Sequence, residues 1–209
     1  IDTLAFSFCL QLPQRRAMQA QSVAERSELD RWLISMLQSL VAEVNTQMEG
    51  YYLYKVVPAV LSFIDHLTNW YIRRSRRRFW GSVNMDTAQD KADAYQTLYD
   101  CLVDFSKVLA PVLPFLSEGI YQHLVVEMGA AKEGEDSVHL CDYPTVNQEY
   151  INERLESQIA LAREVVSLGR ALREKHKLKT RQPLAAVTIV HHDEQVRTDL
   201  AAQAHLIEE

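Results

Sequence analysis

Apolar residues recur every three or four positions along most of this chain, a pattern typical of amphipathic helices. It predicts helices over about 28–49, 52–79, 87–109, 116–129 and 148–175. Glycine and proline occur only six times each, which favours long helices over short strands and turns. Long helices joined by short turns indicate an antiparallel helical bundle, so we expect a mainly α fold.

Local signals set the expected helix ends. Ser27 is placed to cap the first helix, which Gly50 should end. Pro111 and Pro114 should interrupt the chain between the third and fourth helices, because proline cannot donate to the helical ladder. The second helix should bury a stripe that consists of Val56, Val57, Val60, Leu61, Ile64, Leu67, Tyr71 and Ile72.

The pattern changes towards the C-terminus. Residues 184–190 read as a strand, and residues 193–207 read as another helix. We therefore expect two domains: a helical bundle over 1–146, and a junction region over 147–209 that begins a small α+β domain and is truncated.

Composition limits the class of protein. Of the 209 residues, 47% are hydrophobic and 24% are charged, as in ordinary globular proteins. No apolar run approaches the roughly 20 residues that cross a bilayer, so we expect no membrane partner. The three cysteines are far apart and form no C-x-x-C motif, which favours a reducing compartment, the cytoplasm. The first residue is not Met and the last residues continue a helical pattern, so we expect a piece of a longer protein.

Positive charge is concentrated on a chain whose net charge is −6. Residues 69–80, N-W-Y-I-R-R-S-R-R-R-F-W, hold five arginines and no acidic residue. A second basic run over 170–181 carries six basic residues and one acidic residue. Clustered basic charge on an acidic protein favours a polyanionic partner, most often a nucleic acid.

The first run has two readings. Arginines in a last helical turn stabilise the helix terminus and can pair with carboxylates of this chain or of a neighbouring domain, which would make the chain a helical protein–protein interaction module. Five arginines within six positions repel one another without anions between them, which favours nucleic acid. Asn69, Arg73, Arg76 and Trp80 would share one face of a helix. Trp80 could stack on bases, whereas Tyr71 and Trp70 could belong to the core.

Enzyme motifs do not appear in the sequence. There is no glycine-rich phosphate loop, no G-x-S-x-G and no H-E-x-x-H. The sequence His191-His192-Asp193 could suggest a metal site, but adjacent histidines after a strand should point to opposite faces. We therefore expect surface histidines there, and no catalytic residue, metal or cofactor in this chain.

The N-W-Y-I-R-R-S-R-R-R-F-W segment resembles the isoleucyl-tRNA synthetases, in the helical anticodon-binding domain of these class I enzymes. Other segments resemble the same family in the same order, from E-L-D-R-W (28–32) and Y-K-V-V-P-A-V-L-S-F-I-D (54–65) to L-A-P-V-L-P-F-L-S-E-G-I-Y (109–121), S-V-H-L-C-D-Y-P (137–144), V-S-L-G-R-A-L-R-E-K (166–175) and R-Q-P-L (181–184). The resemblance spans residues 1 to about 190. Valyl enzymes share the fold, but there an acid typically follows W-Y-I, where this chain has Arg73 and Arg74.

The resemblance implies that this chain binds the anticodon arm of an isoleucine tRNA. The parent enzyme would use ATP with Mg²⁺ to attach isoleucine, in separate catalytic and editing domains that would be this chain's other partners. The H-I-G-H and K-M-S-K-S motifs of the catalytic part are not in this sequence. The implied RNA-binding residues are Asn69, Arg73, Arg74, Arg76, Arg77 and Trp80 in the bundle, and Arg170, Arg173, Lys175, Lys177 and Arg181 in the junction region.

Overall fold

The computed structural model describes residues 20–80, 85–179 and 182–208. The chain divides into two compact units, Ile1–Ile151 and Asn152–Glu209. In the order of the chain, the described helices of the first unit are η2 (Val23–Glu25), α2 (Glu28–Glu49), α3 (Leu53–Asp65), η3 (His66–Ile72), α4 (Arg76–Trp80), α5 (Met85–Leu109), α6 (Pro114–Tyr121), η4 (Gln122–Val126), η5 (Val138–Leu140) and η6 (Gln148–Tyr150).

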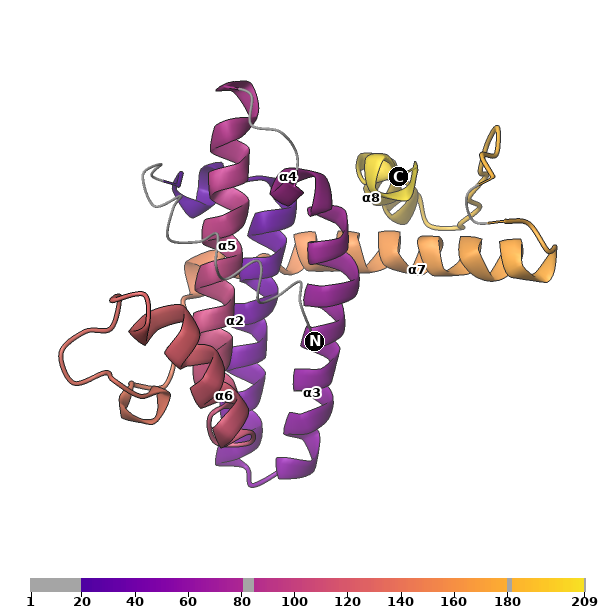
Figure 1. Cartoon of the computed structure of the whole chain (residues 1–209). Helices are drawn as coiled ribbons and strands as arrows, with labels where there is room; N and C mark the ends of the chain where they lie inside the picture. The colour runs from indigo at the N-terminus through magenta and orange to yellow at the C-terminus, as the bar shows by residue number, and fades with distance from the viewer. Residues whose placement is uncertain (1–19, 81–84, 180–181, 209) are drawn as a thin grey trace. The chain divides into compact units, whose positions relative to one another are not determined.

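The first unit is built on α2, α3 and α5, which run side by side (Figure 1). The helix α2 contacts both α3 and α5, and its inner face is mainly apolar, with Trp32, Leu33 and Val41 at most 1% exposed. Between α3 and α5, the rings of Phe63 and Phe105 pack with their centroids 5.0 Å apart. The predicted helical bundle is confirmed.

The second predicted helix is not one continuous α-helix. It consists of α3, the π-helical segment η3 and the short α4, which begins after a turn at Ser75. A π-helix bonds residue i to i+5 and so fits an extra residue into its turn. Spacing counted for an α-helix therefore does not hold across residues 66–72, and the argument that places Asn69 on the face of Arg73 fails.

The buried stripe of this segment also differs from the prediction. Val57 and Leu61 are 46% and 58% exposed, whereas Phe63 and Trp70 lie in the core. The two exposed residues lie on the solvent-facing side of α3. Trp70 is only 6% exposed, so it is a core residue and is excluded as a base-stacking candidate.

The helix ends predicted at Gly50 and at the two prolines are confirmed, since α2 ends at Glu49, α5 ends at Leu109 and α6 begins at Pro114, but two details differ. Pro114 does not precede a helix but starts α6, because its fixed φ suits the first helical position. Gly50 caps α2 in a right-handed conformation, and the left-handed residue after it is Tyr51, with φ of +59°. Residues 138–140 form the short 3₁₀ helix η5.

The second unit contains α7 (Glu153–Lys175), α8 (Glu194–Ala202) and α9 (Ala204–Glu208), and both short helices contact α7. Leu155, Ile159 and Ala162 are the buried residues of α7. The helical periodicity suggests that Leu168 and Leu172 are buried as well, but they are 57% and 58% exposed. Residues 184–190 form no strand, since they have no ladder partner among the described residues. An α+β character for this unit stays a prediction.

Candidate nucleic-acid interface

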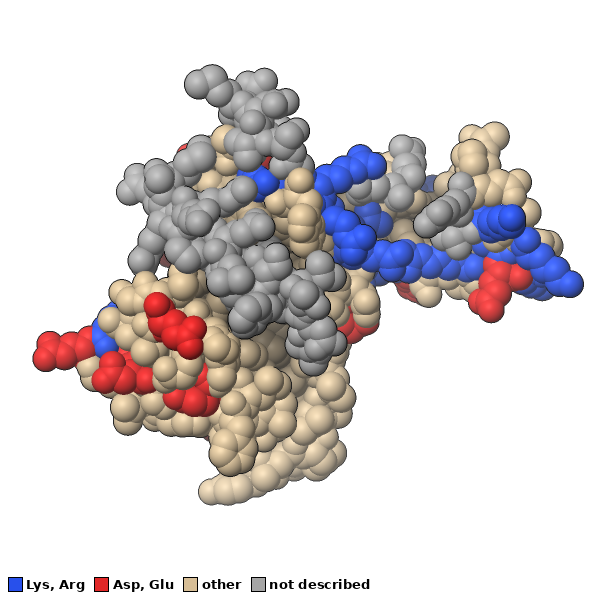
Figure 2. All heavy atoms as spheres, in the orientation of Figure 1, with Lys and Arg blue, Asp and Glu red and all other residues tan. Residues whose placement is uncertain are grey.

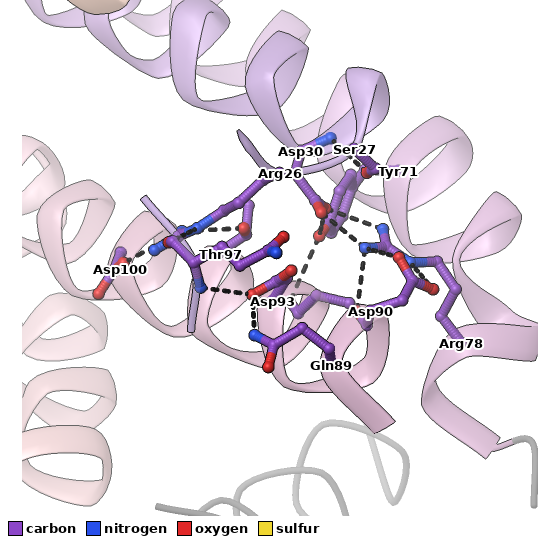
Figure 3. A network of polar contacts seen from close by, with 12 residues as sticks. Arg26, Ser27, Asp30, Tyr71, Arg78, Gln89, Asp90, Asp93, Thr97 and Asp100 are labelled. Atoms are coloured by element: carbon purple, nitrogen blue, oxygen red, sulfur yellow. Dashed lines mark hydrogen bonds and ion pairs between the residues drawn. The ribbon is translucent and has the colours of Figure 1, made fainter. Parts of the chain in front are cut away.

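One arginine of the first basic run, Arg78, is turned inward and serves the fold. Its Nη1 donates to Oδ1 of Asp30 at 2.8 Å and its Nη2 donates to Oδ2 at 2.6 Å. The same guanidinium reaches the Asp90 carboxylate, with Nε 2.9 Å from Oδ2 (Figure 3). Arg78 therefore joins α4 to both α2 and α5.

Asp30 is fully buried, so its charge needs this compensation. The hydroxyl of Tyr71 supplies another donor, 2.6 Å from Oδ1 of Asp30. Burial and the neighbouring Asp30 raise the pKa of Tyr71 well above its ordinary value, so this hydroxyl keeps its proton. Burial opposes the charge on Arg78, but the hydrogen bonds and the charge of Asp30 outweigh it and raise the pKa of Arg78.

A second inward arginine, Arg26, anchors the chain just before α2. It donates through Nε to the carbonyl of Gln21 at 3.0 Å and through Nη1 to the hydroxyl of Thr97 at 3.1 Å. The Asp100 carboxylate lies 3.6 Å from the same Nη1. Burial raises the pKa of Asp100, and Arg26 acts in the opposite direction. Figure 3 shows this group beside the Arg78 group, so two inward arginines secure the same end of the bundle.

The other arginines of the run behave differently. Arg73, Arg76 and Arg77 are exposed, and no carboxylate among the described residues pairs with them. The run therefore contains one structural arginine, Arg78, and three arginines whose charged groups face solvent. Three unneutralised guanidinium groups within five positions form a strong local anion-binding surface.

The remaining candidates of the first run are neighbours of these arginines in the sequence. Arg74 is half-buried and lies over the ring of Trp70, with its guanidinium carbon 4.0 Å from the ring centroid. Asn69 is exposed, and its amide donates to Asp65 at 2.6 Å. Trp80 is 49% exposed, and its ring is edge-on to Phe79 with centroids 5.9 Å apart. Trp80 thus keeps open ring surface for stacking.

The second basic run lies at the C-terminal end of α7. Arg170, Lys175 and Lys177 are exposed. Arg173 is partly occupied, because its Nη1 donates to the carbonyls of Lys179 and Gln182 at 3.1 and 2.8 Å. Arg181 lies outside the described residues. On the face shown in Figure 2, basic side chains gather at the right-hand end of α7.

The two histidines are not on opposite faces. The rings of His191 and His192 stack with centroids 4.4 Å apart, since no strand forms before them. In the part of the chain that the structure describes, no group of three or more histidine, cysteine or acidic residues could hold a metal ion. Nor does any helix among those residues have the length and apolarity to cross a membrane.

Residues 30–189 match the family described as the anticodon-binding domain of tRNA ligase. The chain belongs to this family. It is 41% identical over 207 residues to the isoleucine–tRNA ligase of Protochlamydia amoebophila, covering 98% of this chain and 19% of that protein. It is 46% identical over 185 residues to the enzyme of Chlamydia trachomatis serovar L2, covering 88% of this chain and 17% of the relative.

The isoleucine–tRNA ligase of Treponema denticola is 46% identical over 182 residues, which are 87% of this chain and 16% of that protein. The chain therefore spans less than a fifth of the length of these relatives. In this anticodon-binding domain, both the structural arginine and the exposed arginines lie within the matched range. The partners of Arg78 escaped the sequence reasoning, although the family-like E-L-D-R-W segment contains Asp30.

Proposed function

We propose that this chain binds the anticodon arm of an isoleucine tRNA within a longer ligase. That ligase would join isoleucine to its tRNA using ATP and Mg²⁺ in catalytic and editing parts elsewhere in the protein, and would act in the cytoplasm. The family match and the three isoleucine–tRNA ligase relatives support this proposal. ATP and Mg²⁺ are assigned to the parent enzyme, not to this chain.

The observation that carries the proposal is the difference between Arg78 and its neighbours. Arg78 is neutralised by two carboxylates, whereas Arg73, Arg76 and Arg77 have no such partner among the described residues. If the basic run served only ion pairs within this chain, which is one form of the protein–protein interaction alternative, all of these arginines would resemble Arg78. Exposed and uncompensated arginines instead suit phosphate groups.

Each basic run can contribute by itself. In the first, Asn69, Arg74 and Trp80 flank the three arginines and provide polar and stacking groups. In the second, Arg170, Lys175 and Lys177 provide exposed positive charge. Arg173 is half-buried, and its guanidinium also holds the segment after α7 through the carbonyls of Lys179 and Gln182. Arg181 stays a candidate from its position in the sequence. These residues would mostly contact the backbone, which fixes register without reading sequence.

Binding to an isoleucine tRNA and to an unrelated tRNA across a salt series tests the proposal. Removing a cation that binds one phosphate should reduce the slope of log K against log salt by about one unit. Arg73→Ala and Arg77→Ala should each show this decrease, whereas Lys132→Ala, which removes an 82%-exposed cation from a surface loop, should leave the slope unchanged. Unchanged slopes in all the arginine variants would refute the binding of phosphates by these arginines.

A further inference from the structure

The turn between α2 and α3 exposes three tyrosines within four residues. Tyr51, Tyr52 and Tyr54 are 89%, 48% and 72% exposed, whereas Tyr71 and Tyr121 of the same unit are at most 1% exposed. We name residues 50–55 the tyrosine turn. Figure 1 places this turn at the lower end of the bundle. Exposed aromatic groups gathered at one point indicate a binding surface.

The backbone of the tyrosine turn is firmly held. The backbone N–H of Tyr52 donates to the carbonyl of Gln47 at 2.8 Å, and the backbone N–H of Tyr51 donates to the carbonyl of Met48 at 3.0 Å. These two bonds form a Schellman motif, in which the left-handed position usually belongs to glycine. Here Tyr51 occupies it, with φ of +59°. A large side chain kept in a strained conformation at the tip of a turn points to a function for that side chain.

The rings are also arranged by their neighbours. A Cβ on Gly50 would come within 2.7 Å of the Tyr52 ring, so glycine is needed for that ring to lie against the backbone. The rings of Tyr52 and Tyr54 meet edge to face with centroids 6.3 Å apart. The ammonium of Lys55 lies 4.7 Å from the Tyr52 centroid and 5.9 Å from that of Tyr54. Tyr52 thus supports the turn, Tyr51 and Tyr54 expose ring surface to solvent, and Lys55 places a cation near Tyr54.

We propose that the tyrosine turn is a stacking platform for unpaired nucleobases of an RNA loop, with Tyr51 and Tyr54 as the stacking residues. Aromatic rings beside a positive charge suit splayed single-stranded bases, whose faces are available for stacking and whose phosphates lie nearby. A duplex hides its bases and would gain nothing here. The inference rests on the proposed function, because that function supplies an RNA with an unpaired loop.

The test uses a hairpin RNA whose loop contains a fluorescent adenine analogue, and a blunt duplex of the same stem. The whole 209-residue chain should bind the hairpin and quench the analogue. Tyr51→Gly should weaken hairpin binding by about tenfold and leave duplex binding unchanged. The same change relieves the left-handed strain, so the melting temperature should stay the same or rise. Tyr51→Phe, which keeps the ring, should bind like the wild type, and Tyr51→Gly combined with Tyr54→Ala should bind more weakly than Tyr51→Gly.

Three outcomes would overturn the inference. Equal hairpin affinity of the wild type and the double variant, with a reduced salt slope still seen in Arg77→Ala, leaves the proposed function standing and assigns the turn to a protein contact. Equal losses for hairpin and duplex would show that the turn does not read unpaired bases. A wild-type chain that binds neither RNA at low salt removes the proposed function and this inference with it.

Discussion

Arg78 holds Asp30 through two parallel hydrogen bonds of 2.8 and 2.6 Å, across 48 positions of the sequence. The exposed fraction of the Asp30 side chain is 0%, and that of Arg78 is 15%. A planar guanidinium matches a carboxylate in this geometry better than a lysine could. The pair fixes the five-residue α4 to α2, and the neighbouring arginines are positioned with it.

We expect Arg78→Met to destabilise the fold by about 3–5 kcal/mol, because it leaves the Asp30 carboxylate buried without its charge partner. Urea unfolding measures the change. Arg76→Met is the matched control on the same short helix, and since Arg76 is exposed its effect should stay within about 0.5 kcal/mol. Adding Asp30→Leu to Arg78→Met should recover part of the loss. Equal stabilities for the two methionine variants would contradict the structural role of Arg78.

Asp90→Ala should weaken RNA binding by about threefold or more, although it removes a negative charge. Asp90 accepts from Arg78 at 2.9 Å and tethers α4 to α5, so its loss leaves the exposed arginines less preorganised. Electrostatics alone predicts the opposite sign. Asp104→Ala is the control, since Asp104 lies on α5 with a similarly exposed side chain and pairs with Lys107 instead. Tighter binding by Asp90→Ala than by Asp104→Ala would argue against the tether.

Tyr71→Phe should lower the free energy of unfolding by about 1–3 kcal/mol, because the buried Asp30 carboxylate loses a hydrogen-bond donor at 2.6 Å. Chemical denaturation of the purified chain gives the difference. Tyr54→Phe removes a hydroxyl from a ring that is 72% exposed, and it should leave the stability unchanged. Similar small effects in both variants would mean that the hydroxyl of Tyr71 contributes little.

Stability should fall in acid partly through Glu118. Burial opposes its charge, but donors from Gln122, Ser137 and the Val138 amide outweigh burial and lower its pKa below the ordinary 4.5. A lowered carboxylate pKa stabilises the fold fully above pH 4.5, and this contribution disappears as the pH falls through the lower folded-state pKa. Unfolding of the wild type and Glu118→Gln at pH 7 and in the acid range should show a difference that shrinks in acid.

Glu133→Gln serves as the control for that measurement, since Glu133 is exposed in the loop before Ser137. Its stability difference from the wild type should be near zero at every pH. A constant difference between the wild type and Glu118→Gln across the whole pH range would show that the hydrogen bonds to Glu118 do not depend on its charge.

The bundle could be predicted because α2 and α5 follow ordinary helical periodicity, with Trp32, Leu37 and Val44 or Leu98 and Phe105 all buried as expected. The basic run could also be located. The difference between Arg78 and the exposed arginines could not be predicted, because nothing in the local sequence distinguishes Arg78 from Arg77. The distinction comes from Asp30 and Asp90, which the tertiary fold brings to Arg78.

The tyrosine turn was missed for a related reason. Gly50 is a common helix terminator, so the sequence suggested that the turn ends there and that Tyr52 begins the next helix. Three tyrosines in four positions were a visible signal, but their exposure depends on the left-handed Tyr51. Such a conformation for a large residue is not expected from local propensity.

The π-helical segment His66–Ile72 sets the direction in which the residues after it face. An additional residue in the turn rotates everything after it by about 100° relative to a plain α-helix. Residues on the outer face of α3 can therefore vary without moving the arginines, whereas closing the wide turn into a plain α-helix without removing a residue would turn Arg78 away from Asp30. The wide turn, more than the identity of the exposed residues in it, decides which arginine enters the core and which ones face outward.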